Sequence, residues 1–428
     1  MKKVALIHCY SDQNRGDAGI IESTIDLINE IEPGCKVSAI SVFNENDERF
    51  KNDHYFTKNI VEGVHPALFF EPSIQKNGIG FSNFKKSLLF LLLFVKNVII
   101  LLFPYRFVAK RLLSQAQFST FVILCEADLV ISKGGSFLYS FKGMTGELFL
   151  TRMLFAFLLP IRLGKKVCIF SQSIGPFENF ISKRLFLYVI GKLKGVYLRE
   201  EKCLEYLPFK YQGLVTVIPD SAFYLSPKPC SFQSTAKKRV AITARPHKFS
   251  SNKQKQARLN EQYINCLILM AKHCLHLGFE VNLVGQVTGP SSGEDDREAL
   301  KLLYSGVGVN TTGLVFWDET KGLMSPKELQ YIYSKMDLVI GTRLHSAIFS
   351  LAVGIPSINI AYHGTKSQGI MASVGLERFV MDINDMQPGN GIKLIDEMLG
   401  WNQATDKISA SVNLHRAALK DAMTEFMV

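Results

Sequence analysis

Short apolar runs that end in polar or glycine-containing loops recur along the chain. The first half has such runs at residues 4–8, 36–42, 127–132, 165–171, 195–199 and 215–218. The second half has them at 239–245, 279–284, 337–340 and 357–362. Unbroken apolar strands are typical of parallel sheets covered on both faces, so these runs predict an α/β fold. Amphipathic stretches at 18–31, 260–277 and 406–426 predict helices.

A chain of 428 residues is expected to form two domains. The composition changes at residues 226–238, which hold two prolines and three serines and read as a linker. We therefore predict an N-terminal Rossmann-like domain over 1–230 and a C-terminal Rossmann-like domain over 238–404. Residues 405–428 are expected to form a helix that packs near the domain junction.

The stretch 87–103, SLLFLLLFVKNVIILLF, is the most apolar part of the chain. Its 17 residues fall short of the ~20 that cross a bilayer, and Lys96 and Asn97 lie in its middle. Residues 72–125 contain seven basic and no acidic residues. This pattern favours a helix that lies in a membrane interface, with a membrane-contact segment at about 80–112. A buried hairpin and a true span stay open as alternatives.

The composition is that of a globular protein, with 47% hydrophobic and 20% charged residues. The eight cysteines show no metal-binding spacing, which indicates a reducing compartment. The net charge of +11 lies in the first half, where 31 Lys and Arg face 20 Asp and Glu, while residues 241–428 hold 18 of each. The excess predicts an acidic partner. Nucleic acid ranks last, because no zinc finger or RNA-binding signature is present.

The segment 335–369, KMDLVIGTRLHSAIFSLAVGIPSINIAYHGTKSQG, reads as strand, loop, helix, strand and loop. Arg343 and His345 lie on the loop after the first strand, beside a helix N-terminus. Such loops line the ligand crevice of an open α/β sheet, and helix N-termini attract anions. Arg343 offers a planar cation and His345 an exchangeable proton. A local ion pair or a helix cap explains either residue alone; together they predict an anionic substrate and acid–base chemistry.

Other strand ends carry small, polar or charged residues as well. Asn14 and Asp17 follow the first strand and are suited either to substrate hydroxyls or to helix capping. The loop lacks a G-x-G-x-x-G sequence, so it is weak support for nucleotide binding. The remaining strand-end candidates are Gly134, Gly135, Gln172, Arg199 and Arg245.

Several further polar residues are given structural or surface roles. Asp295 and Asp296 are expected to begin a helix, because its dipole favours carboxylates in the first turn. His54 and His65 lie in the irregular region 44–80 without partner spacing and are expected at the surface.

These landmarks together resemble the polysaccharide pyruvyl transferases. The matching motifs are N-R-G-D at 14–17, K-G-G-S at 133–136, S-Q-S-I-G-P at 171–176, L-R-E at 198–200, P-D-S-A-F at 219–223, G-E-D-D at 293–296, G-T-R-L-H-S at 341–346, G-I-P at 354–356 and H-G-T-K-S-Q-G at 363–369. The resemblance implies a GT-B-like α/β fold, with two Rossmann-like domains whose parallel sheets face a central cleft. It also implies transfer of pyruvate from phosphoenolpyruvate to two hydroxyls of a sugar, which forms a ketal and releases phosphate.

The resemblance and the chemistry of the residues assign roles to the candidates. His345 and Arg343 are the expected catalytic residues, with His345 as general acid and then base. The expected phosphoenolpyruvate-binding residues are Arg245, Arg199, Leu344, Ser346, Lys366 and Gln368. The expected acceptor-binding residues are Asn14, Asp17, Gly134, Gly135, Ser136 and Gln172. No metal site is expected, and phosphoenolpyruvate is a co-substrate rather than a cofactor.

Two departures and two alternatives qualify this interpretation. Many members carry a histidine where this chain has Gly285-Gln286-Val287, which puts a second histidine base in doubt. The long apolar stretch suggests a lipid-linked acceptor, with residues 85–111 at the inner face of a membrane. A GT-B glycosyltransferase using a nucleotide-sugar donor is the first alternative. It requires a carboxylate that binds the ribose of the nucleotide, and the sequence shows no clear one beyond the candidates Asp318 and Glu319. A non-catalytic membrane scaffold is the second.

Overall fold

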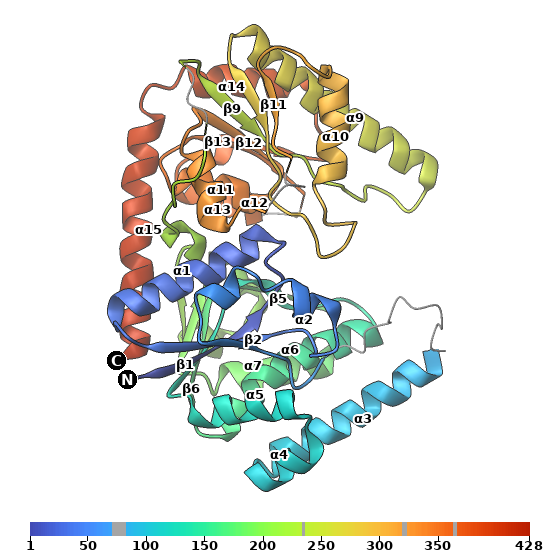
Figure 1. Ribbon diagram of the computed structural model, residues 1–428, viewed down its shortest axis with the longest axis vertical. Coiled ribbons are helices and arrows are strands. Elements are labelled where there is room, and N and C mark those ends of the chain that lie inside the picture. Colours follow the sequence, from blue (N-terminus) through green and yellow to red (C-terminus); the bar gives the residue numbers. More distant parts are fainter. Residues whose placement is uncertain (71–82, 233–235, 319–322, 363–365) are drawn as a thin grey trace. The chain divides into compact units, whose positions relative to one another are not determined.

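The computed structural model describes residues 1–70, 83–232, 236–318, 323–362 and 366–428, of which 83–87 are described by their backbone alone. The described chain divides into two compact units (Figure 1). Unit 1 comprises Met1–Asp12, Ile20–Ser221 and Leu419–Val428, and unit 2 comprises Gln13–Gly19 and Ala222–Ala418. The first residues of helix α1 (Arg15–Ile31) thus belong to unit 2, whereas the sequence analysis assigned them to the N-terminal domain.

Unit 1 is built on a parallel sheet of eight described strands in the order β3-β2-β1-β4-β6-β7-β8, with β5 paired to β6. Its strands are β1 Lys3–Cys9, β2 Lys36–Ser41, β3 Gly63–His65, β4 Leu129–Ser132, β5 Gly135–Ser140, β6 Lys166–Phe177, β7 Gly195–Leu198 and β8 Val215–Val217. The six strands predicted in this half are confirmed. Strand β5 is new, because its opening Gly134-Gly135 pair reads locally as a turn.

Helices cover both faces of this sheet, which explains why its strands are apolar throughout. Residues Val4, Ala5, Leu6 and Ile7 of β1 are all at most 1% exposed. The helices are α1, α2 Glu48–Asn52, α3 Asn83–Leu102, α4 Arg106–Leu112, α5 Gln115–Glu126, α6 Met144–Arg162, α7 Phe180–Ile190 and α8 Phe209–Gln212. The end of the last helix, α15 (Ala404–Met427), also packs in unit 1, which includes Leu419–Val428.

Unit 2 has a parallel sheet of six described strands in the order β11-β10-β9-β12-β13-β14. This is the doubly wound order, and it reverses direction between β9 and β12. The strands are β9 Arg239–Ile242, β10 Glu280–Leu283, β11 Leu314–Phe316, β12 Leu338–Gly341, β13 Ser357–Ala361 and β14 Val380–Asp382. The helices are α9 Lys253–His276, α10 Arg297–Val307, α11 Pro326–Tyr333, α12 Leu344–Leu351, α13 Lys366–Ser373, α14 Pro388–Leu399 and the first part of α15.

Local sequence signals account for several helix ends in unit 2. Ser325 caps α11 and forms a capping box with Glu328, while Pro326 occupies the first helical position. Helix α12 ends before Gly354, whose φ of 80° suits a residue without a Cβ. The helix begins at Leu344, two residues earlier than the sequence predicted, with Arg343 at its N-cap position.

Two expectations for the first half need revision. The region 44–80 contains α2 and β3, and His54 is not at the surface but fully buried, where its Nε2 lies 2.8 Å from the Oγ of Ser41. The stretch 87–103 forms most of one helix, α3, so the hairpin alternative is wrong. Among the described helices, only α6 is long and apolar enough to cross a membrane, judged by length and composition alone, and 44% of its apolar stretch is buried. A core helix passes the same test.

Candidate active site

The candidate site lies at the carboxyl ends of β9 and β12 in unit 2. These neighbouring parallel strands pair Ile242 with Ile340, and the strand order reverses between them. Ligands of doubly wound sheets bind outside the carboxyl strand ends at such a switch point. Arg245 follows β9, and Arg343 and His345 follow β12, so the topology brings three predicted residues to one place.

Arg343 is held by a buried carboxylate. Its Nε and Nη2 donate to the same oxygen of Asp296, at 3.0 and 2.7 Å, and Nη2 also donates to the Glu294 carbonyl at 2.5 Å. The Asp296 side chain is fully buried, and 10% of the Arg343 side chain is exposed. This pairing satisfies one edge of the guanidinium and fixes its plane.

Burial and pairing set the charge states of these two residues. Burial raises the pKa of Asp296, while Arg343 and backbone amides oppose that shift by stabilising the carboxylate. Burial alone would lower the pKa of Arg343, but Asp296 and a hydrogen bond to Tyr362 raise it above its ordinary value. Arg343 therefore stays cationic at every physiological pH.

The loop after β10 presents Asp296 to Arg343. The second oxygen of Asp296 accepts from the backbone N–H groups of Gln286 and Val287, at 3.0 and 2.9 Å. Arg15 clamps the same loop: its Nε donates to the Gln286 carbonyl at 3.1 Å and its Nη2 to the Gly285 carbonyl at 2.9 Å. Arg15 is 1% exposed, so the start of α1 is a built-in wall of this site.

Arg245 is the second cation, and it is held differently. Its guanidinium lies over the ring of Tyr362, 3.5 Å from the ring centre, and its Nε donates to the Pro246 carbonyl at 3.1 Å. Burial lowers the pKa of Arg245, and the nearby charge of Arg343 lowers it further. Its Nη1 is buried and has no hydrogen-bond partner among the described residues. A buried guanidinium with an unused donor is suited to an anionic ligand.

His345 lies in the first turn of α12 and packs against the start of α1. A methyl group added at Gly16 would approach its Nδ1 to 2.4 Å, so the imidazole lies directly on the Gly16 backbone. Its ring is also 6.4 Å from that of Phe349. The site thus brings Arg245, Arg343 and the half-buried His345 together with one carboxylate, Asp296, while Arg15 supports the loop behind them. That set can bind an anion of more than one charge and move a proton.

Four other residues of unit 2 were expected to bind phosphoenolpyruvate: Leu344, Ser346, Lys366 and Gln368. Ser346 is fully buried and donates to the Arg343 carbonyl at 2.6 Å, which stabilises the turn. Leu344 begins α12, Lys366 begins α13 in a half-buried position, and Gln368 is exposed. Residues 363–365 of the predicted loop lie outside the described residues, as does Glu319.

Arg199 lies in unit 1 and is bound there by two carboxylates. Its Nη1 is 2.5 Å from Asp220, its Nε is 3.3 Å from Glu200, and Nε also donates to the Ser173 hydroxyl at 2.8 Å. Only 3% of its side chain is exposed. The structure thus shows Arg199 as the centre of a buried ion-pair network that holds the end of β7.

The predicted acceptor residues divide between the two units. Asn14 and Asp17 belong to unit 2, where Asn14 accepts from the Gly16 and Asp17 amides and donates to the Asp17 carboxylate at 2.7 Å. In unit 1, Gln172 is fully buried in β6, and its Oε1 has no hydrogen-bond partner among the described residues. Gly135 and Ser136 lie at the start of β5, next to Gly134, where Gly135 pairs with Gln172.

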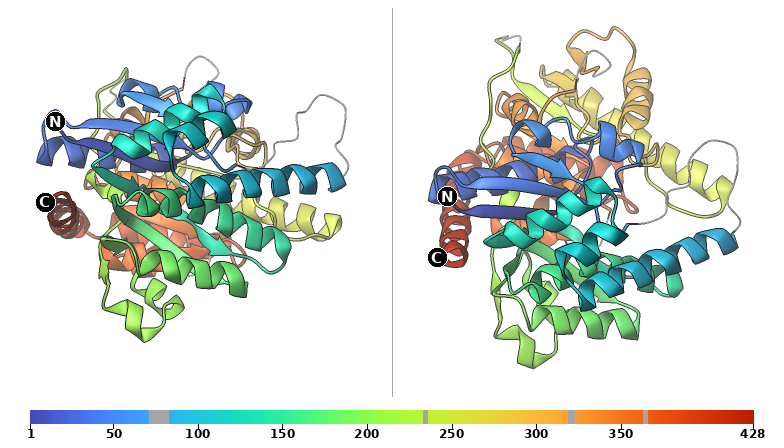
Figure 2. Two further views of the ribbon diagram at one scale, coloured as in Figure 1. Left: turned by 90° about the horizontal axis from the view of Figure 1, so that it is seen from below. Right: turned by 60° about the horizontal axis from the view of Figure 1, so that its bottom comes forward.

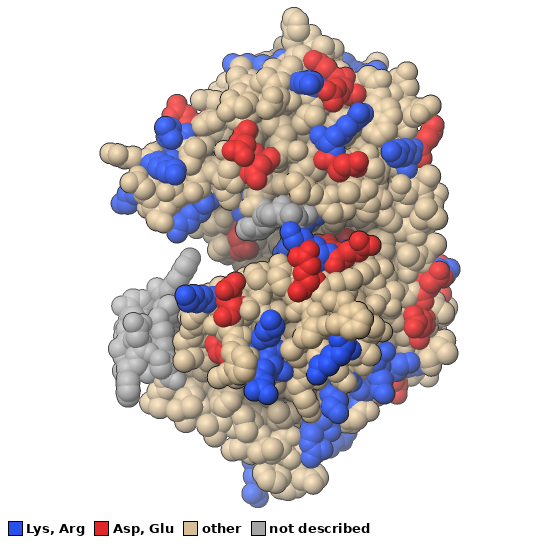
Figure 3. Space-filling model, turned by 180° about the vertical axis from the view of Figure 1, so that it is seen from behind, with Lys and Arg blue, Asp and Glu red and all other residues tan. Residues whose placement is uncertain are grey.

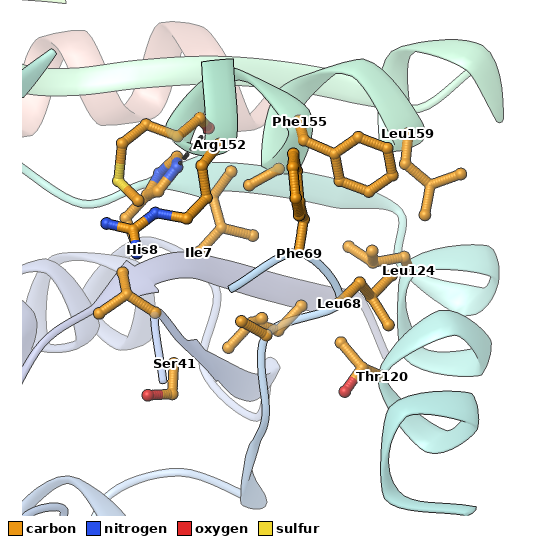
Figure 4. Close-up of a pocket in the computed structure, with 15 residues that line it drawn as sticks. Ile7, His8, Ser41, Leu68, Phe69, Thr120, Leu124, Arg152, Phe155 and Leu159 are labelled. Atoms are coloured by element: carbon orange, nitrogen blue, oxygen red, sulfur yellow. Dashed lines mark hydrogen bonds between the residues drawn. The ribbon is translucent and has the colours of Figure 1, made fainter. Parts of the chain in front are cut away.

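A separate cavity of about 40 Å³ lies in unit 1 (Figure 4). Phe69, Phe155 and Leu159 line its apolar part, and His8 and Arg152 lie at one end. Burial lowers the pKa of His8 to about 4, so its imidazole is neutral at physiological pH. The volume suits a few water molecules at most, and the walls are mainly apolar, so a sugar or a phosphate does not fit.

Sequence reasoning missed Asp296, Tyr362 and Arg15. Asp296 belongs to the G-E-D-D motif but was given a helix-dipole role; it does occupy the N-cap position of α10, without a capping hydrogen bond. Tyr362 ends an apolar strand, where its polar role has no local signature. The described residues contain no group of three or more His, Cys, Asp or Glu that could hold a metal ion.

Comparison with known proteins supports the same fold and the same family. The chain is 25% identical to the "Amylovoran biosynthesis protein AmsJ" of Erwinia amylovora, over 97% of this chain and 96% of that protein. It is similar in fold to the UDP-GlcNAc 2-epimerase of Neisseria meningitidis, with a TM-score of 0.54, 10% identity and coverage of 100% and 99%. It is also similar to UGT2 of Phytolacca americana, with a TM-score of 0.53, 10% identity and full coverage of both chains.

These structural neighbours confirm a GT-B-like α/β fold with two parallel sheets. The model of one family, described as polysaccharide pyruvyl transferase, matches residues 14–364, which include every residue of the arginine and histidine site. The chain therefore belongs to the polysaccharide pyruvyl transferase family and is a transferase.

Proposed function

We propose that this protein transfers pyruvate from phosphoenolpyruvate to two hydroxyls of one sugar in a polysaccharide precursor. Phosphoenolpyruvate carries its carboxylate and its phosphate on the same carbon, C2, and it therefore needs cations on more than one side. The observation that carries the proposal is the pair Arg245 and Arg343 at the switch point of unit 2, with the buried Nη1 of Arg245 not hydrogen-bonded by any described residue.

The charges of the site favour this donor over a neutral one. Arg343 is paired with the carboxylate of Asp296, whereas the charge of the buried Arg245 has no ion-pair partner among the described residues. An anion that enters would neutralise that charge and relieve the repulsion between Arg245 and Arg343. Arg343, already bound along one edge, positions the ligand, and Arg245 supplies the new hydrogen bonds. Lys366 and Gln368 at the start of α13 are proposed to assist at the phosphate, and Leu344 and Ser346 to shape the turn.

His345 is the proposed general acid and base. The imidazolium of His345 protonates the methylene carbon of phosphoenolpyruvate. This step makes C2 a cation, which the first sugar hydroxyl attacks. That hydroxyl loses its proton to His345, which restores the imidazolium. The C2–phosphate bond then breaks, the second hydroxyl closes the ketal, and its proton leaves with the phosphate. One proton thus ends on the new methyl group and one on phosphate.

The acceptor is proposed to be a sugar linked to a lipid carrier, and the protein to work peripherally at the inner face of the membrane. The proposed acceptor-binding residues are Asn14, Asp17, Gly134, Gly135, Ser136 and Gln172, with Arg199 as a further candidate for the donor. The unused buried acceptor of Gln172 supports its place in that list. The basic surplus of residues 1–240 and the apolar helix α3 support the membrane.

The direct test supplies carbon-labelled phosphoenolpyruvate together with saccharides extracted from cells that make the polysaccharide. The expected result is acid-labile label on the saccharide, with one phosphate released for each pyruvate bound. His345→Gln should abolish transfer while it preserves phosphoenolpyruvate binding. Release of phosphate without labelled saccharide, or labelling by a nucleotide sugar instead, would refute the proposal.

A further inference from the structure

Helix α3 (Asn83–Leu102) has an inner face that packs on unit 1. Leu93, Asn97 and Ile100 recur at helical spacing on this face and are 8%, 1% and 0% exposed. The Asn97 side chain donates to the Leu68 carbonyl at 3.3 Å. Phe69, which lines the cavity of Figure 4, lies 5.3 Å from the ring of Phe90. These contacts fix α3 along the outside of unit 1 (Figure 2).

The opposite face of α3 is also apolar, and it is exposed. Its residues follow the spacing of a single helix stripe, and the apolar character continues into α4 with Tyr105 and Phe107 at 58% and 65% exposure. The stripe consists of Leu88, Leu91, Leu92, Val95, Ile99 and Leu102, which are 47%, 55%, 59%, 46%, 36% and 58% exposed. A surface helix normally places polar residues on this side, and contiguous apolar surface of this kind marks an interaction site.

The charge around the stripe is positive. Lys110 and Arg111 on α4 are exposed, and among the described residues neither has an ion-pair partner. Residues 72–125 contain seven basic and no acidic side chains. Figure 3 shows that Lys and Arg are also exposed on the lower part of the opposite face of the molecule, with few Asp or Glu among them. An apolar stripe with a basic border is complementary to an anionic lipid surface.

We propose that the outer face of α3, together with α4, is a docking surface for an anionic membrane, on which α3 lies flat. A transmembrane path for α3 is disfavoured, because its inner face is already packed against protein through Asn97. A second copy of this chain is disfavoured as the occupant, because a symmetric contact would place the basic residues of both copies face to face. The surface deepens the proposed function, since a lipid-linked acceptor would be met there, and all the residues that form it belong to unit 1.

The test uses the full chain and flotation with vesicles, either of phosphatidylcholine or of phosphatidylcholine mixed with phosphatidylglycerol. The first variant is Leu91→Glu with Leu92→Glu, and the second replaces the same residues by Gln. Because both side chains are exposed, folding should be preserved, which thermal unfolding verifies. Leu302→Glu and Leu414→Glu are matched controls, since these leucines are 54% and 72% exposed on other helices.

Wild type and controls should float with the mixed vesicles and less with phosphatidylcholine alone. Each substituted leucine should weaken binding by roughly 10-fold. Lys110→Glu with Arg111→Glu should weaken binding to the mixed vesicles by about 5-fold per residue, less so at high salt. Phosphoenolpyruvate binding should be unchanged in all variants. A failure to bind phosphoenolpyruvate would therefore count against the proposed function and not against the docking surface. Undiminished flotation of the leucine variants, or a wild-type dimer that they convert to monomer, would overturn the proposal.

Discussion

Arg343 donates through Nε and Nη2 to one oxygen of Asp296, at 3.0 and 2.7 Å, and both side chains lie in the interior of unit 2. Arg343, expected from sequence to be a catalytic residue, is thus held in place by a carboxylate, and Arg245 has the donor without a partner among the described residues. We infer that Arg343 sets the geometry of the site and that Arg245 binds the anion.

Asp296→Asn should destabilise the protein by about 3–5 kcal/mol, because it leaves the buried charge of Arg343 without its counterion. The free energy of unfolding in urea measures the effect. Asp295→Asn is the matched control: its partner Arg297 is 38% exposed, so a loss of about 1 kcal/mol or less is expected. Equal losses for the two variants would contradict the assigned role of Asp296.

Arg245→Gln should weaken phosphoenolpyruvate binding by roughly 10- to 100-fold, the value of a charge-assisted hydrogen bond in a buried site. Arg245→Lys should recover little of this, because a lysine cannot both lie over Tyr362 and present a planar fork. Calorimetric titration with phosphoenolpyruvate gives the affinities. Arg258→Gln, an exposed arginine of α9, should bind like wild type. If Arg245→Gln also binds like wild type, the anion lies elsewhere.

Gly16→Ala should lower the turnover number much more than the stability. The added methyl would approach Nδ1 of His345 to 2.4 Å and displace the imidazole, whereas alanine suits the helix better than glycine. Steady-state kinetics and thermal unfolding separate the two effects. Gly213→Ala, where a methyl meets nothing within 4 Å, is the control. Unchanged turnover in Gly16→Ala would show that the position of His345 is not critical.

The strand ends that carry Arg245, Arg343 and His345 could be predicted from sequence, because carboxyl ends of adjacent parallel strands meet at one edge. Asp296 could not, because its role depends on a loop that reaches Arg343 across 47 residues of chain, while its local setting favours a helix start. Arg15 was hidden for the same reason: its carbonyl partner Gly285 is 270 residues away. Long-range pairing of this kind leaves no local pattern.

The fold shows the same limit. Apolar runs predicted the strands of both sheets, since burial on both faces demands them. The same rule does not reveal β5, which begins at Gly135 with φ of 138°. His54 was expected at the surface because it lies in an irregular region without partner spacing, and the sequence gives no sign of its contact with the Ser41 hydroxyl in the interior.

Acidification should destabilise the protein partly through His54. Burial lowers its pKa from 6.5 to about 4. His54 therefore binds a proton below about pH 6.5 in the unfolded chain but only below about pH 4 in the folded chain. The contribution to stability is therefore complete above pH 6.5 and is lost as the pH falls toward 4, by about 1.4 kcal/mol per pH unit. Urea unfolding at several pH values should show a smaller acid loss in His54→Gln. Identical pH profiles for the wild type and His54→Gln would contradict the assignment.

Ligand-dependent thermal unfolding of the wild type and of Arg245→Gln, with phosphoenolpyruvate or with UDP-GlcNAc, shows whether the anion site of unit 2 binds phosphoenolpyruvate. A ligand at 100 times its dissociation constant stabilises the folded state by about 2.7 kcal/mol. Phosphoenolpyruvate should raise the melting temperature of the wild type and not of the variant, and UDP-GlcNAc should raise neither. A rise with UDP-GlcNAc and none with phosphoenolpyruvate would contradict this expectation.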